Sequence, residues 1–203
     1  MTVGELELEE PVRIDASKVM AILQRDHQRL GAVLERVEHE LGARRDLQAL
    51  CADAASHGRL LGMLAFLHEY ADRIHHPLET RLFDRLIEKG LTPSERRVVF
   101  VTMSQHEEIL GDLLGLQEEL RRLQGQAPRE LAAALRTRAE RYLDAQKRHL
   151  HFEDSQLLPL IFARLTARDW CEMERDLAAQ IGIIAESCER EFLPAFRAIL
   201  EAA

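Results

Sequence analysis

The sequence twice places a histidine four residues before a glutamate, within apolar runs that have the spacing of an α-helix. The first pair is His75 and Glu79, and the second is His149 and Glu153. Side chains four residues apart on an α-helix lie on the same face, one turn apart. The two members of each pair can therefore reach a single metal ion.

A lone histidine on an earlier segment precedes each pair. His27 comes before the first pair and His106 before the second, and both lie in the middle of an apolar stripe that is predicted to face the core. The chain therefore reads as two copies of one half-site.

Apolar residues recur at spacings of three and four along four long segments, which predicts four amphipathic helices. The first helix is expected to begin at a cap provided by Asp15 or Ser17. The second is expected to run from about residue 47 to a C-cap at Gly90, with a local bend at Pro77.

A third helix is predicted to start at Thr92, which can form a capping box with Glu95, and a fourth to follow residues 125–128. The four histidines then fall one on each helix. Four long helices joined by short loops pack as an up-down-up-down bundle, in which facing side chains build cofactor sites. The predicted fold class is all-α, because no segment alternates with the period of a strand.

The two ends of the chain are expected to differ from the bundle. Residues 1–15 read as an irregular acidic tail, residues 16–165 as the bundle, and residues 166–203 as one or two additional C-terminal helices that begin after a cap near Thr166. This C-terminal extension can pack on the bundle, cover the site or form a homodimer.

Composition narrows the classes of function. Of the 203 residues, 46% are hydrophobic and 31% charged, which is typical of a globular protein rich in helices. The net charge of −8 argues against nucleic acid as the main partner. Three widely spaced cysteines indicate neither a disulfide framework nor a zinc motif, and no window has the length and apolarity of a membrane span. We expect a soluble, cytoplasmic protein without a nucleic-acid or membrane partner.

The alternative interpretation of the polar residues is structural, because a lone histidine on an apolar helix face is more often a core residue than a ligand. Here, however, six polar groups are predicted to converge inside the bundle, and glutamate is almost never fully buried without a partner or a metal. The candidate metal ligands are His27, His75, Glu79, His106, His149 and Glu153.

The predicted ligand set provides two imidazoles for each of two metal ions and two carboxylates to bridge them. This arrangement leaves coordination positions open for water or a small diatomic ligand. Mixed imidazole and carboxylate ligation with open positions suits iron or manganese, and differs from the closed four-ligand sites of structural zinc.

Other residues are expected to have lesser parts. His76 lies about 100° around an α-helix from His75, so it is predicted to swing toward the site or to bond to a ligand rather than to belong to the ligand set. His68 and Tyr142 each lie seven residues before the histidine of a pair, and are expected beside the site.

The remaining assignments concern surface and core. The histidines expected in solvent are His39, His57 and His151. Glu107, beside His106, is a weaker candidate for contact with the metal. The residues expected to fill the core at helical spacing include Met20, Met103 and Leu131.

At these residues the chain resembles the hemerythrin-like, HHE cation-binding proteins. The motifs that carry the resemblance are Asp26-His27, the run from His75 to Phe83, His106-Glu107-Glu108, and the run from His149 to Pro159, and together they cover about residues 16–165. The resemblance implies a four-helix bundle with a non-haem di-iron centre, bridged by carboxylates with or without an oxo group. It also implies that the six candidate residues are the ligands. Members of the family bind dioxygen, respond to nitric oxide or oxidative stress, sense iron or oxygen, or help to repair iron centres.

Two positions depart from the oxygen-carrying hemerythrins. Those proteins place a second histidine one turn after the third-helix histidine, where this chain has Leu110. Their last ligand is an aspartate five residues after its histidine, whereas Glu153 follows His149 by four. One imidazole fewer argues against reversible oxygen carriage.

Three hypotheses follow. The first is a protein that binds two iron ions, or manganese, and senses or reacts with O2, NO or peroxide in oxidative or nitrosative stress or in iron homeostasis. The second is an enzyme that consumes peroxide or acts as an oxidase, with Tyr142 near its site. The third is a metal-free helical interaction module, for which replacement of His75 or Glu79 would change neither function nor metal content.

Overall fold

A computed structural model of the chain describes residues 16–43, 47–125, 128–173 and 188–201, which are almost entirely helical and contain no strand. The elements are α1 (Ala16–Ala43), α2 (Leu47–Ala52), α3 (Ala54–Tyr70), η1 (Ala71–His75), α4 (His76–Glu88), α5 (Pro93–Arg122), α6 (Arg129–Phe152), η2 (Glu153–Leu157), α7 (Leu158–Arg164), η3 (Cys188–Phe192) and α9 (Leu193–Glu201). Residues 167–173 are also helical. The all-α prediction is confirmed for the described residues.

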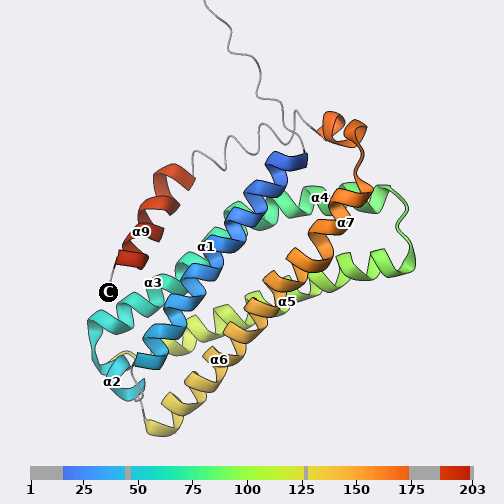
Figure 1. Cartoon of the computed structure of the whole chain (residues 1–203). Helices are drawn as coiled ribbons and strands as arrows, with labels where there is room; N and C mark the ends of the chain where they lie inside the picture. Colours follow the sequence, from blue (N-terminus) through green and yellow to red (C-terminus); the bar gives the residue numbers. More distant parts are fainter. Residues whose placement is uncertain (1–15, 44–46, 126–127, 174–187, 202–203) are drawn as a thin grey trace, which may run out of the picture.

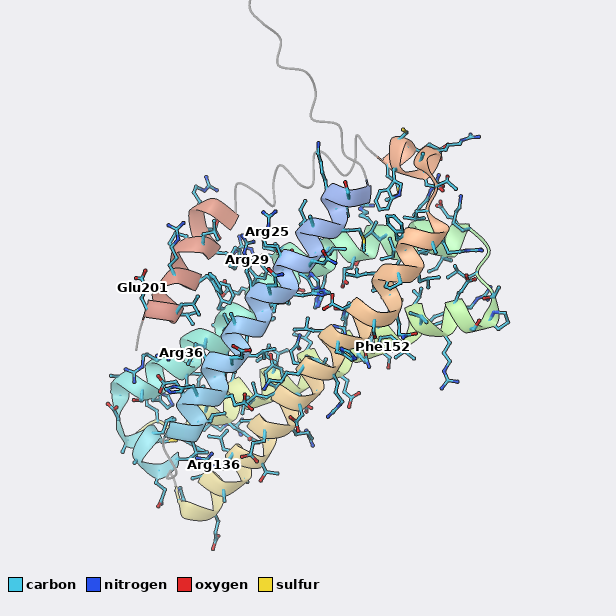
Figure 2. The ribbon with its side chains drawn as sticks, viewed as in Figure 1. Arg25, Arg29, Arg36, Arg136, Phe152 and Glu201 are labelled. Atoms are coloured by element: carbon cyan, nitrogen blue, oxygen red, sulfur yellow. The ribbon has the colours of Figure 1, made fainter. Side chains whose placement is uncertain are left out.

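The long helices form a closed ring of neighbours. Helix α1 packs against α3 and α6, and α5 packs against the same two helices (Figure 1). Helix α9 packs against α1 and α3. Side chains fill the space between the helices (Figure 2), and the fully buried ones include Leu23, Leu30, Leu64, Leu78 and Leu82. Of the predicted ligands, His27, His106 and His149 belong to helices of this ring. The other three lie in η1, α4 and η2, which continue α3 and α6 along the chain.

The second predicted helix is divided near its start. Helix α2 ends at Ala52, and Asp53 caps α3 by accepting a hydrogen bond from the backbone N–H of Ala55 at 3.3 Å. A capping aspartate within an apolar run therefore separates a short helix from a long one. The predicted N-terminal tail and Asp15 lie outside the described residues, which begin with α1 at Ala16.

The predicted start of α5 and end of α4 are confirmed. The hydroxyl of Thr92 accepts a hydrogen bond from the backbone N–H of Glu95, and the carboxylate of Glu95 accepts one from the backbone N–H of Thr92 at 2.8 Å. Gly90 follows the C-cap of α4 with a φ of 69°. This left-handed conformation strongly favours glycine.

Each of the three π-helical turns in the described residues ends two residues before a proline. These turns are η1, η2 and η3, and the prolines are Pro77, Pro159 and Pro194. A proline ring within an α-helix clashes with the carbonyl four residues earlier, and its nitrogen donates no hydrogen bond. A π-helical turn widens the backbone at that point, so the chain continues as a helix through the proline.

The inward faces of two helices differ from the predicted stripes. Met103 is 42% exposed, and the fully buried position on that part of α5 belongs to Thr102, whose hydroxyl donates to the carbonyl of Val98. Leu131 is 52% exposed because the buried series of α6 begins one residue later, at Ala132. A stripe with spacings of three and four leaves its edge residues ambiguous, and tertiary packing decides between them.

The start of the C-terminal extension is fixed to α4. Thr166 caps the helical segment that follows it, because its hydroxyl accepts a hydrogen bond from the backbone N–H of Asp169 at 3.4 Å, and its own backbone N–H donates to the carboxylate of Asp169 at 2.7 Å. Asp169 is buried and also forms ion pairs with Arg85 of α4 and with Lys89, the C-cap of that helix. The predicted cap near Thr166 is thus confirmed. Within the described ranges, no helix has both the length and the apolarity that crossing a membrane requires.

Candidate metal centre

The six predicted ligands converge at one level of the molecule. His27 comes from α1, His75 from the end of η1, and Glu79 from α4. His106 lies on α5, and the last pair lies on α6 and at the start of η2. The side chains of Glu79, Glu153, His75 and His149 are at most 2% exposed, and His106 is 16% exposed.

Glu153 contacts histidines with both of its carboxylate oxygens. Its Oε1 lies 3.1 Å from the Nε2 atoms of His106 and His149. Its Oε2 lies 3.3 Å from Nε2 of His27 and 3.8 Å from Nε2 of His75. Glu153 is therefore at the centre of the cluster.

Glu79 also contacts two of the clustered histidines. Its Oε2 lies 3.6 Å from Nε2 of His75 and 3.3 Å from Nε2 of His106. Neither oxygen of this fully buried carboxylate makes a hydrogen bond. Burying a carboxylate without a partner is strongly unfavourable, so this side chain needs a cation or a proton.

Several other buried atoms in the cluster also lack a hydrogen-bond partner. They are Nε2 of His27, both ring nitrogens of His75 and Oε2 of Glu153. Native proteins rarely leave such atoms unsatisfied unless an ion or water completes the site. Nitrogen and oxygen donors aimed at a common centre fit a metal cation, so the residues present match the group that the sequence implied.

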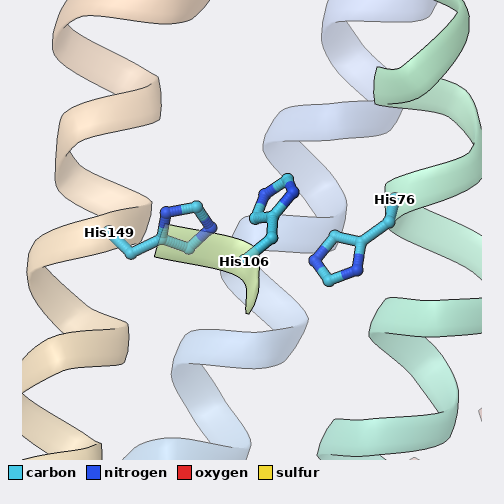
Figure 3. Close-up of side chains that lie close together, drawn as sticks. All are labelled: His76, His106 and His149. Carbon is cyan, nitrogen blue, oxygen red and sulfur yellow. The ribbon is translucent and has the colours of Figure 1, made fainter. Parts of the chain in front are cut away.

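The potential ligand atoms fall into two groups. A four-residue group contains His27, His75, Glu79 and Glu153. A three-histidine group contains His76, His106 and His149 (Figure 3). In each group the ligand atoms lie within 4.8 Å of one another, which is close enough for one ion to contact them all.

His76 was not in the predicted ligand set, yet the structure brings it into the second group. Its ring stacks on that of His106, with centroids 4.1 Å apart. The prediction assumed α-helical geometry, whereas His76 directly follows the wider turn of η1. Adjacent residues lie closer around the axis of such a turn, so neighbouring histidines can face the same centre.

Burial and the neighbouring His106 and His75 lower the pKa of His76 to about 2. Burial likewise lowers the pKa of His106, despite the nearby Glu153. These two imidazoles are therefore neutral at physiological pH and have a lone pair available for a cation.

The two buried carboxylates have opposite pKa shifts. Burial and the proximity of Glu153 and Asp26 raise the pKa of Glu79 well above its ordinary value. Burial alone would raise the pKa of Glu153 too, but its contacts with four histidines hold it well below the ordinary range. Without a metal, Glu79 is thus the more readily protonated of the two. A bound divalent cation would favour the ionised form of both.

Two residues outside the predicted set orient ligand histidines. Nδ1 of His27 lies 2.8 Å from Oδ1 of Asp154, and Nδ1 of His149 lies 3.1 Å from Oε1 of Gln105. In each ring this contact leaves Nε2 directed at the cluster. These partners adjoin Glu153 and His106 in the sequence, but only the fold brings them to their histidines.

Other predictions had mixed outcomes. His39 and His151 are exposed as expected, and Glu107 is exposed and belongs to neither group. His57 was expected in solvent, but it is buried and its Nε2 lies 2.8 Å from the carbonyl oxygen of Leu120. That carbonyl lies in the last turn of α5, where the backbone carbonyls have no N–H donor four residues later in the helix.

A small cavity of about 30 Å³ adjoins the three-histidine group. His68 and Tyr142 line it, so both lie beside the site as predicted. A larger cavity of about 440 Å³ lies between α1, α3 and the C-terminal η3–α9 segment, and contains none of the seven clustered residues. The larger cavity therefore lies apart from the cluster, and the small one borders the three-histidine group.

Residues 18–161 match the family model described as the hemerythrin HHE cation binding domain. A comparison with the curated proteins and one with the solved structures gave no match. The matched segment spans well over half of the chain and includes every residue of the two groups. The chain therefore belongs to the hemerythrin HHE cation-binding domain family.

Proposed function

We propose that this protein holds two iron ions in its His/Glu cluster and uses them to sense or react with O2, NO or peroxide, in oxidative or nitrosative stress or in iron homeostasis. One observation carries the proposal. Glu79 and Glu153 each lie within 3.8 Å of histidines from both groups. Carboxylates in this position can bridge two cations.

The donor set favours iron or manganese over other common metals. Each group offers imidazole nitrogens, and the shared carboxylates supply the remaining donors without any thiolate. This combination suits iron or manganese and leaves positions open. When bound, iron supplies redox chemistry and vacant positions for small ligands. The chain's own residues fix the ions, exclude bulk water and restrict the size of what can enter.

The arrangement of helices agrees with the same proposal. The closed ring of contacts among α1, α3, α5 and α6 is what an up-down-up-down four-helix bundle requires. We propose this topology for residues 16–165, with residues 166–203 as a helical extension that can also form a homodimer.

Metal content tests the proposal. The protein would be reconstituted anaerobically with ferrous iron, analysed by mass spectrometry, and its absorption recorded before and after exposure to air. About two irons per chain and a new near-ultraviolet band on oxidation are expected. The His75→Ala and His149→Ala variants should lose iron, whereas His57→Ala, which removes a buried histidine outside both groups, should retain it. No bound iron, or equal iron in all variants, would leave the metal-free interaction module as the better reading.

The same preparation separates binding from catalysis. Steady-state consumption of peroxide by the iron-loaded protein, above the rate given by free iron, would identify an enzyme. Uptake of peroxide in a fixed ratio to the protein, without repeated turnover, would identify a sensor or binding protein.

A further inference from the structure

The volume of the small cavity beside the three-histidine group limits the size of the molecule that can occupy it. Its volume of about 30 Å³ exceeds the ~10–15 Å³ that a single water needs. A diatomic molecule can therefore fit there. The residues that line the cavity include the apolar side chains of Leu30, Leu67 and Leu113.

Tyr142 lines this cavity, and its hydroxyl has no hydrogen-bond partner among the residues that the structure describes. Its side chain is 1% exposed, and its hydroxyl makes no hydrogen bond to any described residue. A buried tyrosine hydroxyl usually finds a partner. The other tyrosine of the chain, Tyr70, follows that rule, because its hydroxyl donates to Asp26 at 2.6 Å.

The phenol of Tyr142 is suited to donate a hydrogen bond. Burial raises its pKa well above the ordinary value, so it keeps its proton at physiological pH. Tyr142 lies two turns before His149 on α6, and both residues line the cavity. The donor and the three-histidine group therefore border the same small space.

We propose that Tyr142 is a positioning residue that donates a hydrogen bond to the small ligand held in this cavity. This inference rests on the proposed function. It also assigns a ligand class: diatomic molecules that gain negative charge on binding to reduced iron, such as O2 and NO, accept this bond best. The ligand then accepts the hydrogen bond of this otherwise unpartnered hydroxyl. The hydroxyl does not contribute to the stability of the fold.

The test uses nitric oxide as the probe on the anaerobic, ferrous-loaded full chain. Infrared spectroscopy measures the N–O stretching frequency, and stopped-flow measures the dissociation of NO. The Tyr142→Phe variant should raise the frequency, abolish its sensitivity to D2O and speed dissociation roughly five- to tenfold, which corresponds to the loss of one hydrogen bond. The Tyr70→Phe variant should leave the frequency unchanged.

A second measurement uses the metal-free protein. Because the hydroxyl of Tyr142 bonds to nothing in the fold, Tyr142→Phe should not lower the denaturation midpoint, whereas Tyr70→Phe should. A lowered midpoint for Tyr142→Phe, or an unchanged N–O frequency and dissociation rate, overturns the inference and leaves the proposed function intact. Failure of the wild-type protein to take up iron or NO overturns both.

Discussion

Asp154 holds His27 across the bundle, because its Oδ1 lies 2.8 Å from Nδ1 of a histidine 127 residues earlier in the chain. The adjacent Glu153 contacts the opposite nitrogen of the same ring. Two consecutive residues of η2 therefore fix one imidazole from both sides. The contact with Asp154 assigns the proton to Nδ1 and leaves Nε2 free to bind a cation.

Removing this contact should weaken metal binding more than folding. We expect Asp154→Ala to lower the affinity for ferrous iron roughly 10- to 100-fold, as is typical when the partner of a ligand histidine is lost. The change in unfolding free energy should be below about 1 kcal/mol, because the carboxylate of Asp154 is half exposed. Competitive titration against a chelator measures the affinity. Gln156→Ala, an exposed change in the same turn, is the control, and equal affinities in the two variants would contradict the prediction.

The two buried glutamates should differ in their effect on the metal-free protein. The raised pKa of Glu79 favours its neutral form there, so Glu79→Gln replaces the carboxyl with a neutral group of similar shape and should change the unfolding free energy by less than about 1 kcal/mol. Glu153 is ionised among four histidines, so Glu153→Gln should destabilise by about 2–4 kcal/mol.

Denaturant unfolding at pH 7 with excess chelator tests this difference. Both variants should lose iron in the presence of metal, because both carboxylates lie between the two groups. Equal destabilisation by the two substitutions in the metal-free state would show that the proton is not held by Glu79.

Local patterns were sufficient to predict the helices and most of the cluster. The capping box of Thr92 and Glu95 depends only on residues close in sequence, and helical period alone placed His27 and His106 on inward faces. The four-residue spacing in each His/Glu pair then brought the rest of the six together. These features persist in the fold because each is determined within a few turns of one helix.

Features that depend on irregular backbone or on distant segments could not be predicted in this way. His76 joins the three-histidine group because η1 departs from α-helical geometry. His57 is buried because a carbonyl in the last turn of α5 lies beside it. Asp154 and Gln105 acquire their histidine partners only when separate helices pack. The proline two residues after the turn was the available signal for η1, since it predicts a departure from regular helix at that point.

The prolines offer a separate test of the π-helical turns. In a Pro77→Ala variant, the restored N–H and the smaller side chain should let η1 relax toward an α-helix. The helix should be unchanged or slightly more stable, but His75 and His76 should rotate away from their groups and iron affinity should fall. Hydrogen exchange and iron titration measure the two effects. Pro194→Ala, after the π-turn farthest along the chain, should leave iron affinity unchanged. Retained affinity in Pro77→Ala would show that the turn does not depend on the proline.

The contact between the C-terminal extension and α4 should give the protein a characteristic acid sensitivity. Hydrogen bonds from Lys89 and Thr166 hold the pKa of Asp169 well below its ordinary value, although its burial acts in the opposite direction. The folded state therefore keeps this carboxylate ionised at pH values where the unfolded chain has protonated it. The stabilisation is fully present above the unfolded pKa of about 4 and is lost as the pH falls from there toward the folded pKa.

Asp169→Asn should remove this part of the pH dependence. At pH 7 the variant should be less stable by about 1–2 kcal/mol, because charge-assisted hydrogen bonds are weakened. Below pH 4 its stability should fall less steeply than that of the wild type. Denaturant unfolding in chelator, followed by the fluorescence of Trp170, reports on this contact directly, since that residue is the only tryptophan and lies buried next to Asp169. Glu172→Gln, which alters a more exposed partner of Arg85, should change the slope less. Parallel stability curves for wild type and Asp169→Asn would mean that another carboxylate governs acid unfolding.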